Sequence, residues 1–292
     1  MSSASISGAL NFDERHFQSI AETVRLISGI DLPERKKSLV YGRLVKRIRV
    51  LGLESFDDYC ELIRDKTGKE TEHLLSSLTT NVTRFFREPH HFEYLEREHY
   101  PRLFDLRNKS KRIRFWSAGC STGEEAYSLA MSLYASCGPQ KVEHIRILAT
   151  DIDHQVLRKA ESGIYPKTVF PDIPSRLKPE RFLKQIAETV EVAGDIRSMI
   201  RFRHLNLVSD WPINGPFDAI FCRNVAIYFD QATQQQLWSK FERVLAPGGI
   251  LAIGHSERLS GPAFNSFENV GITTYRKRNQ DSVEVSANPE KK

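Results

Sequence analysis

From Arg112 onward the chain alternates short apolar runs with amphipathic stretches of helical length, and this alternation narrows its possible folds more than any other feature. A strand that leads through a helix to the next strand forms a parallel pair, and repetition of that unit builds an open sheet. The pattern therefore predicts an α/β fold with a doubly wound, mostly parallel sheet. The apolar runs are 113–118, 145–151, 217–222 and 250–255, the helices lie near 124–136, 153–161 and 231–245, and 273–278 is predicted as a last edge strand.

The first 80 residues differ, because no strand signal interrupts their helical periodicity. Apolar side chains recur every three or four residues, and Gly29 and Gly52 follow two of the segments as helix stops. We expect an N-terminal all-α domain over residues 10–80, followed by a linker and helix over 81–110. The predicted helices span 14–28, 34–51, 55–64, 70–78 and 89–107.

A proline-containing stretch, residues 166–203, breaks the alternation inside the predicted sheet domain of residues 111–278. It holds a helical piece, PERFLKQI, and then two β-like runs, ETVEVAG and SMIRFRHL, on either side of Gly194. We expect a small antiparallel β-subdomain inserted into the sheet domain. Residues 279–292 are predicted to form a polar tail.

Composition excludes several classes of protein. No apolar run approaches the roughly 18 residues that a membrane span needs. The N-terminal stretch lacks a basic start followed by an apolar core, so we expect a cytoplasmic protein. The four cysteines form no CxxC pair, and the histidines form no HExxH, which disfavours a disulfide framework or a metal centre. The cysteines are Cys60, Cys120, Cys137 and Cys222.

The positive charge is concentrated in one predicted helix. The chain has 42 basic and 37 acidic side chains, a net charge of +5, and residues 33–49 alone carry seven basic side chains and one acid. This segment therefore holds +6 and the remaining chain −1. A helix this one-sided favours docking to an acidic protein helix, with nucleic acid as the competing ligand and a solvated face as the simplest alternative. The candidate substrate contacts are Lys36, Arg43, Lys46 and Arg47.

The most informative motif is WSAGCSTGEEAYSLA, residues 116–130, where a predicted strand turns into a helix. Gly119 and Gly123 allow the backbone to approach a ligand closely. Glu124 and Glu125 at the helix N-terminus would repel a pyrophosphate, so the loop suits a cationic or neutral nucleoside such as S-adenosylmethionine (SAM) better than a dinucleotide. The alternative is that the glycines form a turn and the acids complement the helix dipole.

Two further motifs follow predicted strands. Asp151 ends its strand, where a carboxylate commonly accepts ribose hydroxyl groups, although it could instead cap the next helix, as Asp153 could equally do. Asn206 and Leu207 follow the third strand and could bracket an adenine.

The next two segments combine polar and aromatic residues. Arg223 and Asn224 come directly after the apolar strand FDAIFC, and Tyr228 lies four residues beyond Asn224. Between the two predicted domains, LTTNVTRFFREPHHF (78–92) contains Asn81, Thr83 and Arg87. Capping and interdomain packing through its two phenylalanines explain this second segment without a ligand.

Taken together, LTTNVTRFFRE, GCSTGEEAYS, ATDID, NL, FDAIFCRNVAIYF and PGGILAIGHSE resemble the chemotaxis receptor methyltransferase family, CheR, from about residue 12 to 278. The resemblance implies a Rossmann-like class I methyltransferase that uses SAM, releases S-adenosylhomocysteine, and methylates glutamate side chains of methyl-accepting chemoreceptors. By position in these motifs, the resemblance implies cofactor contacts at Asn81, Thr83, Arg87, Glu125, Asp151, Asn206, Leu207, Arg223 and Asn224. Gly119 is a candidate cofactor contact as well.

The resemblance also implies that the basic helix and the inserted subdomain face the cytoplasmic part of the receptor. Some family members hold a C-terminal receptor pentapeptide with a glycine-rich loop of the subdomain. This chain has only Gly194 there, a departure that speaks against such a tether.

A receptor glutamate has a pKa of about 4.3 and is ionised near neutral pH, so methyl transfer to it needs alignment rather than a general base. We expect Arg87 to orient the carboxylate and Tyr228 to line the methyl-transfer site. A nucleic-acid methyltransferase and a non-catalytic receptor adaptor are the alternatives. Against the first, the chain lacks a DPPY-like or NPPY-like tetrapeptide and a Pro-Cys pair, and Cys222 fits a core position.

Overall fold

The computed structural model describes residues 10–65, 68–106 and 112–279, so the predicted polar tail lies outside the described residues except for Asn279. These residues form two compact units. The first contains the residues up to Thr80 together with Tyr228–Asp230, and the second contains Asn81–Ile227 and the chain from Gln231 onward. Among the described helices, none combines the length and the apolar character that crossing a membrane requires.

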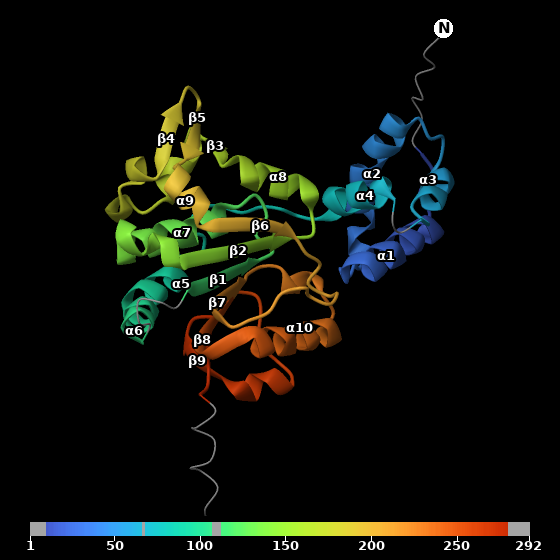
Figure 1. Cartoon of the computed structure of the whole chain (residues 1–292). Helices are drawn as coiled ribbons and strands as arrows, with labels where there is room; N and C mark the ends of the chain where they lie inside the picture. Colours follow the sequence, from blue (N-terminus) through green and yellow to red (C-terminus); the bar gives the residue numbers. More distant parts are fainter. Residues whose placement is uncertain (1–9, 66–67, 107–111, 280–292) are drawn as a thin grey trace, which may run out of the picture. The chain divides into compact units, whose positions relative to one another are not determined.

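Four helices build the first unit (Figure 1, blue to cyan). Asp13 and Ser55 accept hydrogen bonds from the first turns of two of them, and Gly29 and Gly52 end two helices in the left-handed conformation. Apolar side chains at helical spacing, among them Ile20, Val40, Leu44, Ile48 and Leu74, are fully buried. The helices are α1 (Glu14–Ser28), α2 (Lys37–Leu51, after a 3-10 turn Glu34–Lys36), α3 (Phe56–Leu62) and α4 (Lys69–Leu78).

Two of the candidate docking arginines on α2 have partners inside this unit. The Arg43 guanidinium donates to the carbonyl oxygens of Ser77, Leu78 and Thr79 at 3.0 to 3.1 Å, and so caps the C-terminal end of α4. Arg47 donates to both carboxylate oxygens of Glu70, with its shortest contact at 2.6 Å. Both arginines flank the buried stripe of α2, which brings them against α4.

A seven-stranded sheet forms the centre of the second unit (Figure 1). Its strand order is β6-β2-β1-β7-β8-β10-β9; the first five are parallel, and β10 runs antiparallel to both of its neighbours. From β1 the chain adds β2 and β6 on one side and then β7 and β8 on the other, which confirms the expected doubly wound sheet. The strands are β1 (Ile113–Ala118), β2 (Ile145–Asp151), β6 (Ile200–His204), β7 (Phe217–Cys222), β8 (Leu245–Ile253), β9 (Phe267–Gly271) and β10 (Thr274–Lys277).

Helices cover both faces of the sheet, as Figure 1 shows for α7 and α8 on one side and α10 on the other. On the α10 side, Trp116 packs edge-on against Trp211 and Phe241, with ring centroids 4.8 and 5.3 Å away. The predicted helix 89–107 is divided by a π-helical turn. The helices are α5 (Pro89–Tyr94), the turn Leu95–His99, α6 (Tyr100–Leu106), α7 (Glu124–Cys137), α8 (His154–Ser162) and α10 (Gln231–Val244).

The expected antiparallel subdomain is present as a three-stranded sheet of order β3-β5-β4, drawn above α8 and α9 in Figure 1. Its extent differs from the predicted 166–203, because it begins at Ile164 and because residues 200–203 belong to β6 at the edge of the large sheet. Hydrogen bonds to β5 hold 183–186 as a strand, where a helix was predicted. The elements are β3 (Ile164–Pro166), β4 (Leu183–Ile186), β5 (Thr189–Val192) and α9 (Gly194–Ser198).

The predicted edge strand 273–278 is an interior strand. A turn through Thr273, which has a φ of 46°, reverses the chain and places β9 outside β10. The sequence of β9, FENVG, shows no clear apolar alternation, which is why the run was not identified as a strand. The carboxyl ends of the parallel strands β6, β2, β1 and β7 lie side by side. The candidate cofactor residues of the sheet domain lie at or just after these strand ends.

Candidate functional site

The loop after β1 approaches the loop after β7 closely. The backbone N–H groups of Gly119 and Cys120 both donate to the carbonyl oxygen of Thr150 at 2.8 Å, which ties the β1 loop to β2. Gly119 has a φ of 85°, and a Cβ atom there would lie 2.3 Å from a methyl group of Val225. Glycine is therefore required at this position by both conformation and space.

Asp151 at the end of β2 organises this loop from the other side. Its carboxylate accepts hydrogen bonds from the backbone N–H groups of Ser121 at 2.8 Å and of Asp153 at 2.9 Å. Only 9% of the residue is exposed, and burial raises the pKa of its carboxyl to about 6, against the opposing effect of the two N–H donors. Asp153, which accepts from Gln155 N at 2.8 Å, is the residue that caps α8.

Asn81 connects the linker to both of these loops. Its side-chain amide donates to Asp153 Oδ2 at 3.1 Å, and its backbone carbonyl oxygen accepts from the hydroxyl of Ser121 at 3.0 Å. The phenylalanines of the same segment, Phe85 and Phe86, are buried in the core of the second unit. The segment thus packs within the sheet domain, where interdomain packing had been expected.

A buried ion pair links α7 to the end of β7. Arg223 Nε donates to Glu125 Oε2 at 2.7 Å, and the hydroxyl of Ser117 donates to the other carboxylate oxygen at 2.7 Å. The Arg223 side chain is 3% exposed, and it also donates to the carbonyl oxygen of Arg87. Two residues that are almost 100 positions apart in sequence thus meet at the point where the strand order reverses.

A second layer of polar groups surrounds Arg223. His91 Nδ1 lies 3.3 Å from the guanidinium, and Glu88 Oε2 lies 3.6 Å from it. Burial, together with the nearby Arg223 charge, lowers the pKa of His91 to about 3, so the ring is neutral. Its Nδ1 accordingly accepts from Arg223, and its Nε2 donates to the hydroxyl of Thr273 at 3.1 Å. Glu88 and His91 were not predicted, because a single histidine or acid has no distinctive sequence pattern.

Glu88, His90 and His91 each offer one atom that could coordinate a metal ion, and these three atoms lie within 4.8 Å of one another. The hydrogen bonds of His91 leave neither ring nitrogen for an ion, and the Arg223 guanidinium beside Glu88 would repel a cation. These residues therefore do not fit a metal site.

The remaining candidates lie along the same edge of the sheet or in the first unit. The backbone of Leu205 donates to Asp151 O at 3.0 Å, which places Asn206 and the buried Leu207 beside the β2 end. Arg87 is half-buried, as is Thr83, and donates to Val82 O at 3.0 Å. Tyr228 belongs to the first unit, where its ring centroid lies 5.2 Å from Lys36 Nζ.

The arrangement has two features that fit a cationic nucleoside. Glu124 and Glu125 at the N-terminus of α7 are buried and bonded to Thr122 and Arg223, so this helix end holds acidic side chains. Asn224 Oδ1 is buried and, among the described residues, has no donor. A buried acceptor of this kind fits an N–H group of a ligand, which supports the assignment of Asn224 to cofactor binding.

Comparison with known proteins identifies the same two parts of the chain. Residues 81–276 match the family described as "CheR methyltransferase, SAM binding domain", and residues 15–79 match "CheR methyltransferase, all-alpha domain". A "Probable chemotaxis protein methyltransferase" of Rhizobium etli is 44% identical over 254 residues, which cover 85% of this chain and 94% of the relative.

Other relatives are similar over comparable lengths. A "Chemotaxis protein methyltransferase" of Escherichia coli is 40% identical and covers 86% of this chain and 87% of the relative. "Chemotaxis protein methyltransferase 2" of Pseudomonas aeruginosa is 39% identical and covers 91% and 94%.

The raised pKa of Asp151 predicts a pH-dependent stability. The native carboxyl keeps its proton up to about pH 6, whereas the unfolded chain releases it near 3.8, so the free energy of unfolding falls as pH rises between these values. The resulting loss in the free energy of unfolding approaches about 3 kcal/mol above pH 6. Asp151→Asn removes this titration. Urea unfolding of both proteins gives the difference between their free energies of unfolding. We expect the wild-type value to fall relative to that of the variant over this pH interval. A difference that stays constant with pH would contradict the assignment.

Proposed function

The chain belongs to the CheR methyltransferase family, a family of SAM-dependent enzymes, and on that premise we propose that it methylates glutamate side chains of chemoreceptors. The printed names of its relatives, chemotaxis protein methyltransferases, support a role in chemotaxis. The structural observation that carries the proposal is the buried Glu125 at the N-terminus of α7, held by Ser117 and Arg223. Acidic side chains at a helix N-terminus disfavour a phosphate there, which suits a cofactor that carries a sulfonium and an ammonium group and no phosphate.

We assign the cofactor to the carboxyl edge of the sheet. Asp151 would accept the ribose hydroxyls, Asn206 and Leu207 would bracket the adenine, and Asn224 would accept a ligand N–H. When bound, the cofactor supplies an electrophilic methyl group. Arg223 acts on this site through Glu125 and the carbonyl of Arg87, because its Nε and one of its terminal nitrogens are bonded to these protein groups. The proposed cofactor set is Asn81, Thr83, Arg87, Gly119, Glu125, Asp151, Asn206, Leu207, Arg223 and Asn224.

The residues near the reaction orient the substrate. Glutamate is ionised at neutral pH, so the incoming carboxylate needs no base and must be aligned with water excluded. Arg87 donates to Val82 through one nitrogen, and among the described residues its other nitrogens have no partner, which leaves them for a carboxylate. We propose that Arg87 orients the glutamate and that Tyr228 lines the methyl-transfer site.

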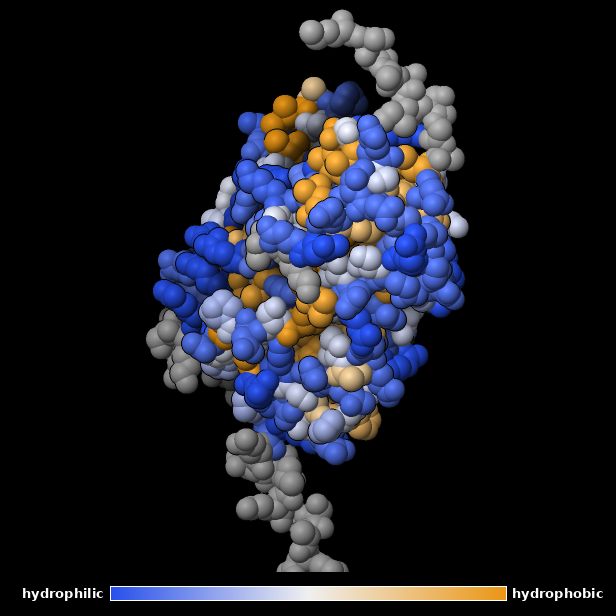
Figure 2. Space-filling view, turned by 90° about the vertical axis from the view of Figure 1, so that its right-hand side faces the viewer, coloured by the Kyte–Doolittle hydropathy of each residue, from blue (hydrophilic) through white to orange (hydrophobic). Residues whose placement is uncertain are grey.

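Receptor docking is proposed for the exposed face of α2. Arg43 and Arg47 are held by α4, and burial lowers the pKa of Lys36, which is half-buried. Lys46 and Arg49 are exposed, lie three residues apart, and make no ion pair with any described residue. The mostly hydrophilic surface in Figure 2 is interrupted by apolar patches, and Leu39 and Val50 of α2 are 40% and 75% exposed. Free positive charge beside apolar side chains suits an acidic, amphipathic receptor helix in the cytoplasm.

The reaction can be tested with SAM that carries a labelled methyl group and membranes that contain chemoreceptors. We expect label on the receptor that alkali releases, because a glutamyl methyl ester is hydrolysed by base. The Arg87→Ala variant, assayed in parallel, should form the ester more slowly. Alkali-stable label on protein, or label in nucleic acid, would rule out glutamate methylation, and no transfer at all would indicate an adaptor.

The docking assignment predicts a substrate-specific defect. Lys46→Glu combined with Arg49→Glu should raise the KM for receptor about tenfold or more, with the SAM dissociation constant unchanged, because opposed charges at the surface become like charges. The defect should shrink as salt is added.

The control variant, Arg64→Glu with Arg243→Glu, changes the net charge by the same amount at exposed positions outside α2. Equal losses in the two double variants would show that the overall charge, and not the α2 face, governs receptor binding.

A further inference from the structure

Glu257, in the turn that follows β8, holds the loop after β7 by its backbone. One carboxylate oxygen accepts from Asn224 N at 3.0 Å and from Gly254 N at 2.5 Å. The other accepts from Val225 N at 2.9 Å and from Ile227 N at 3.2 Å. The residue is 4% exposed, so a single buried carboxylate gathers four backbone donors from two loops.

This carboxylate depends on the loop that it organises. Burial raises the pKa of Glu257, while the N–H groups of Gly254, Asn224 and Ile227 lower it. Among the described residues it makes no ion pair, so the backbone dipoles alone stabilise its charge. Loss of the loop geometry would leave a buried charge without donors, and loss of the carboxylate would leave four N–H groups without an acceptor.

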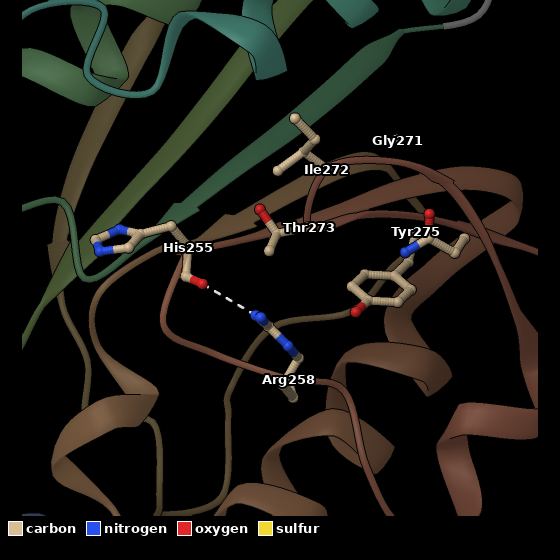
Figure 3. Close-up of a pocket in the computed structure, with 7 residues that line it drawn as sticks. His255, Arg258, Gly271, Ile272, Thr273 and Tyr275 are labelled. Carbon is tan, nitrogen blue, oxygen red and sulfur yellow. Dashed lines mark hydrogen bonds between the residues drawn. The ribbon is translucent and has the colours of Figure 1, made fainter.

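The turn that carries Glu257 is also fixed from its outer side. Figure 3 shows the hydrogen bond from Arg258 to the carbonyl oxygen of His255, on the rim of a hollow bordered by Thr273 and Tyr275. The donor is Arg258 Nη1, and the distance is 2.9 Å. The same nitrogen donates to Glu257 O at 2.7 Å. Arg258 thus bridges two carbonyl oxygens of the turn that carries the carboxylate.

The loop that Glu257 holds is tightly packed. Asn224 has a φ of 60°, a left-handed conformation that asparagine adopts more readily than most side-chain-bearing residues. A Cβ atom on Gly254 would lie 2.5 Å from the Asn224 side-chain nitrogen, so the two loops are in close contact. The Asn224 Oδ1 atom, buried and without a donor among the described residues, is presented by this conformation.

We propose that Glu257 is a positioning residue for methyl transfer, whose carboxylate holds residues 224–227 in the conformation that presents Asn224 to SAM. The inference rests on the proposed assignment of Asn224 to the cofactor. Glu257 itself contacts no reacting atom. It acts through the backbone of the loop, in the way that outer groups orient the ligands of a binding site.

The test compares Glu257→Gln with Asp218→Asn. Glutamine keeps the shape but replaces one acceptor oxygen with a donor, so two backbone N–H groups lose their partner. Asp218 is a matched control, because it is also buried, lies on β7, and accepts a backbone N–H, that of Arg114 at 2.9 Å. Both variants are expected to lower the melting temperature.

Only Glu257→Gln should weaken SAM binding, by about tenfold or more, and speed hydrogen exchange at the amides of 224, 225 and 227. SAM affinity is measured by calorimetry on the folded protein. An unchanged SAM affinity in Glu257→Gln, or an equal loss in Asp218→Asn, would overturn the proposal.

A wild-type measurement covers the case in which Glu257→Gln does not fold. The amides of residues 224, 225 and 227 should be protected and exchange as one group, and exchange of any of them at the rate of an unprotected amide would overturn the proposal. Neither readout uses a receptor. A failure here therefore remains distinct from a failure of glutamate methylation, which the alkali-release assay reports.

Discussion

The buried ion pair between Glu125 and Arg223 is the interaction on which the rest of the site depends. Two charges removed from water are stable only when each has a full set of partners. Ser117 donates to the second carboxylate oxygen, while His91 and the carbonyl of Arg87 accept from the guanidinium. The pair thereby joins the loop after β1, the end of β7 and the segment that follows Asn81 in the second unit, which are distant in sequence.

Two further acids near the site, Asp151 and Glu257, are stabilised by backbone N–H groups. Asp151 accepts two and Glu257 accepts four, and burial raises the pKa of both carboxyls. A sheet edge built in this way has acidic side chains and preformed loops, and among the described residues the buried acceptor Asn224 Oδ1 has no donor and remains for a ligand. Such an edge disfavours phosphate and favours a cofactor that carries positive charge, which explains how a Rossmann-like sheet can bind SAM in place of a dinucleotide.

Much of this arrangement follows from local sequence. The runs 113–118, 145–151 and 217–222 are β1, β2 and β7 with the predicted bounds, and their carboxyl ends carry the predicted residues. Partners set by tertiary packing could not be predicted. Periodicity places Arg47 beside an apolar stripe but cannot reveal Glu70 across from it. Glu257 ends the motif PGGILAIGHSE, but nothing in the sequence indicates that four backbone amides surround its carboxylate. The strand β6 was missed as part of the large sheet, because a run of that length fits either sheet.

The SAM dissociation constants of Glu125→Gln, Arg223→Met and the double variant test the central claim most directly. Residues that act as one unit give non-additive losses. If the ion pair organises the site, the loss of SAM affinity in the double variant should not exceed the larger of the two single-variant losses. If the two losses multiply, Glu125 and Arg223 act independently, and the site does not depend on their pairing.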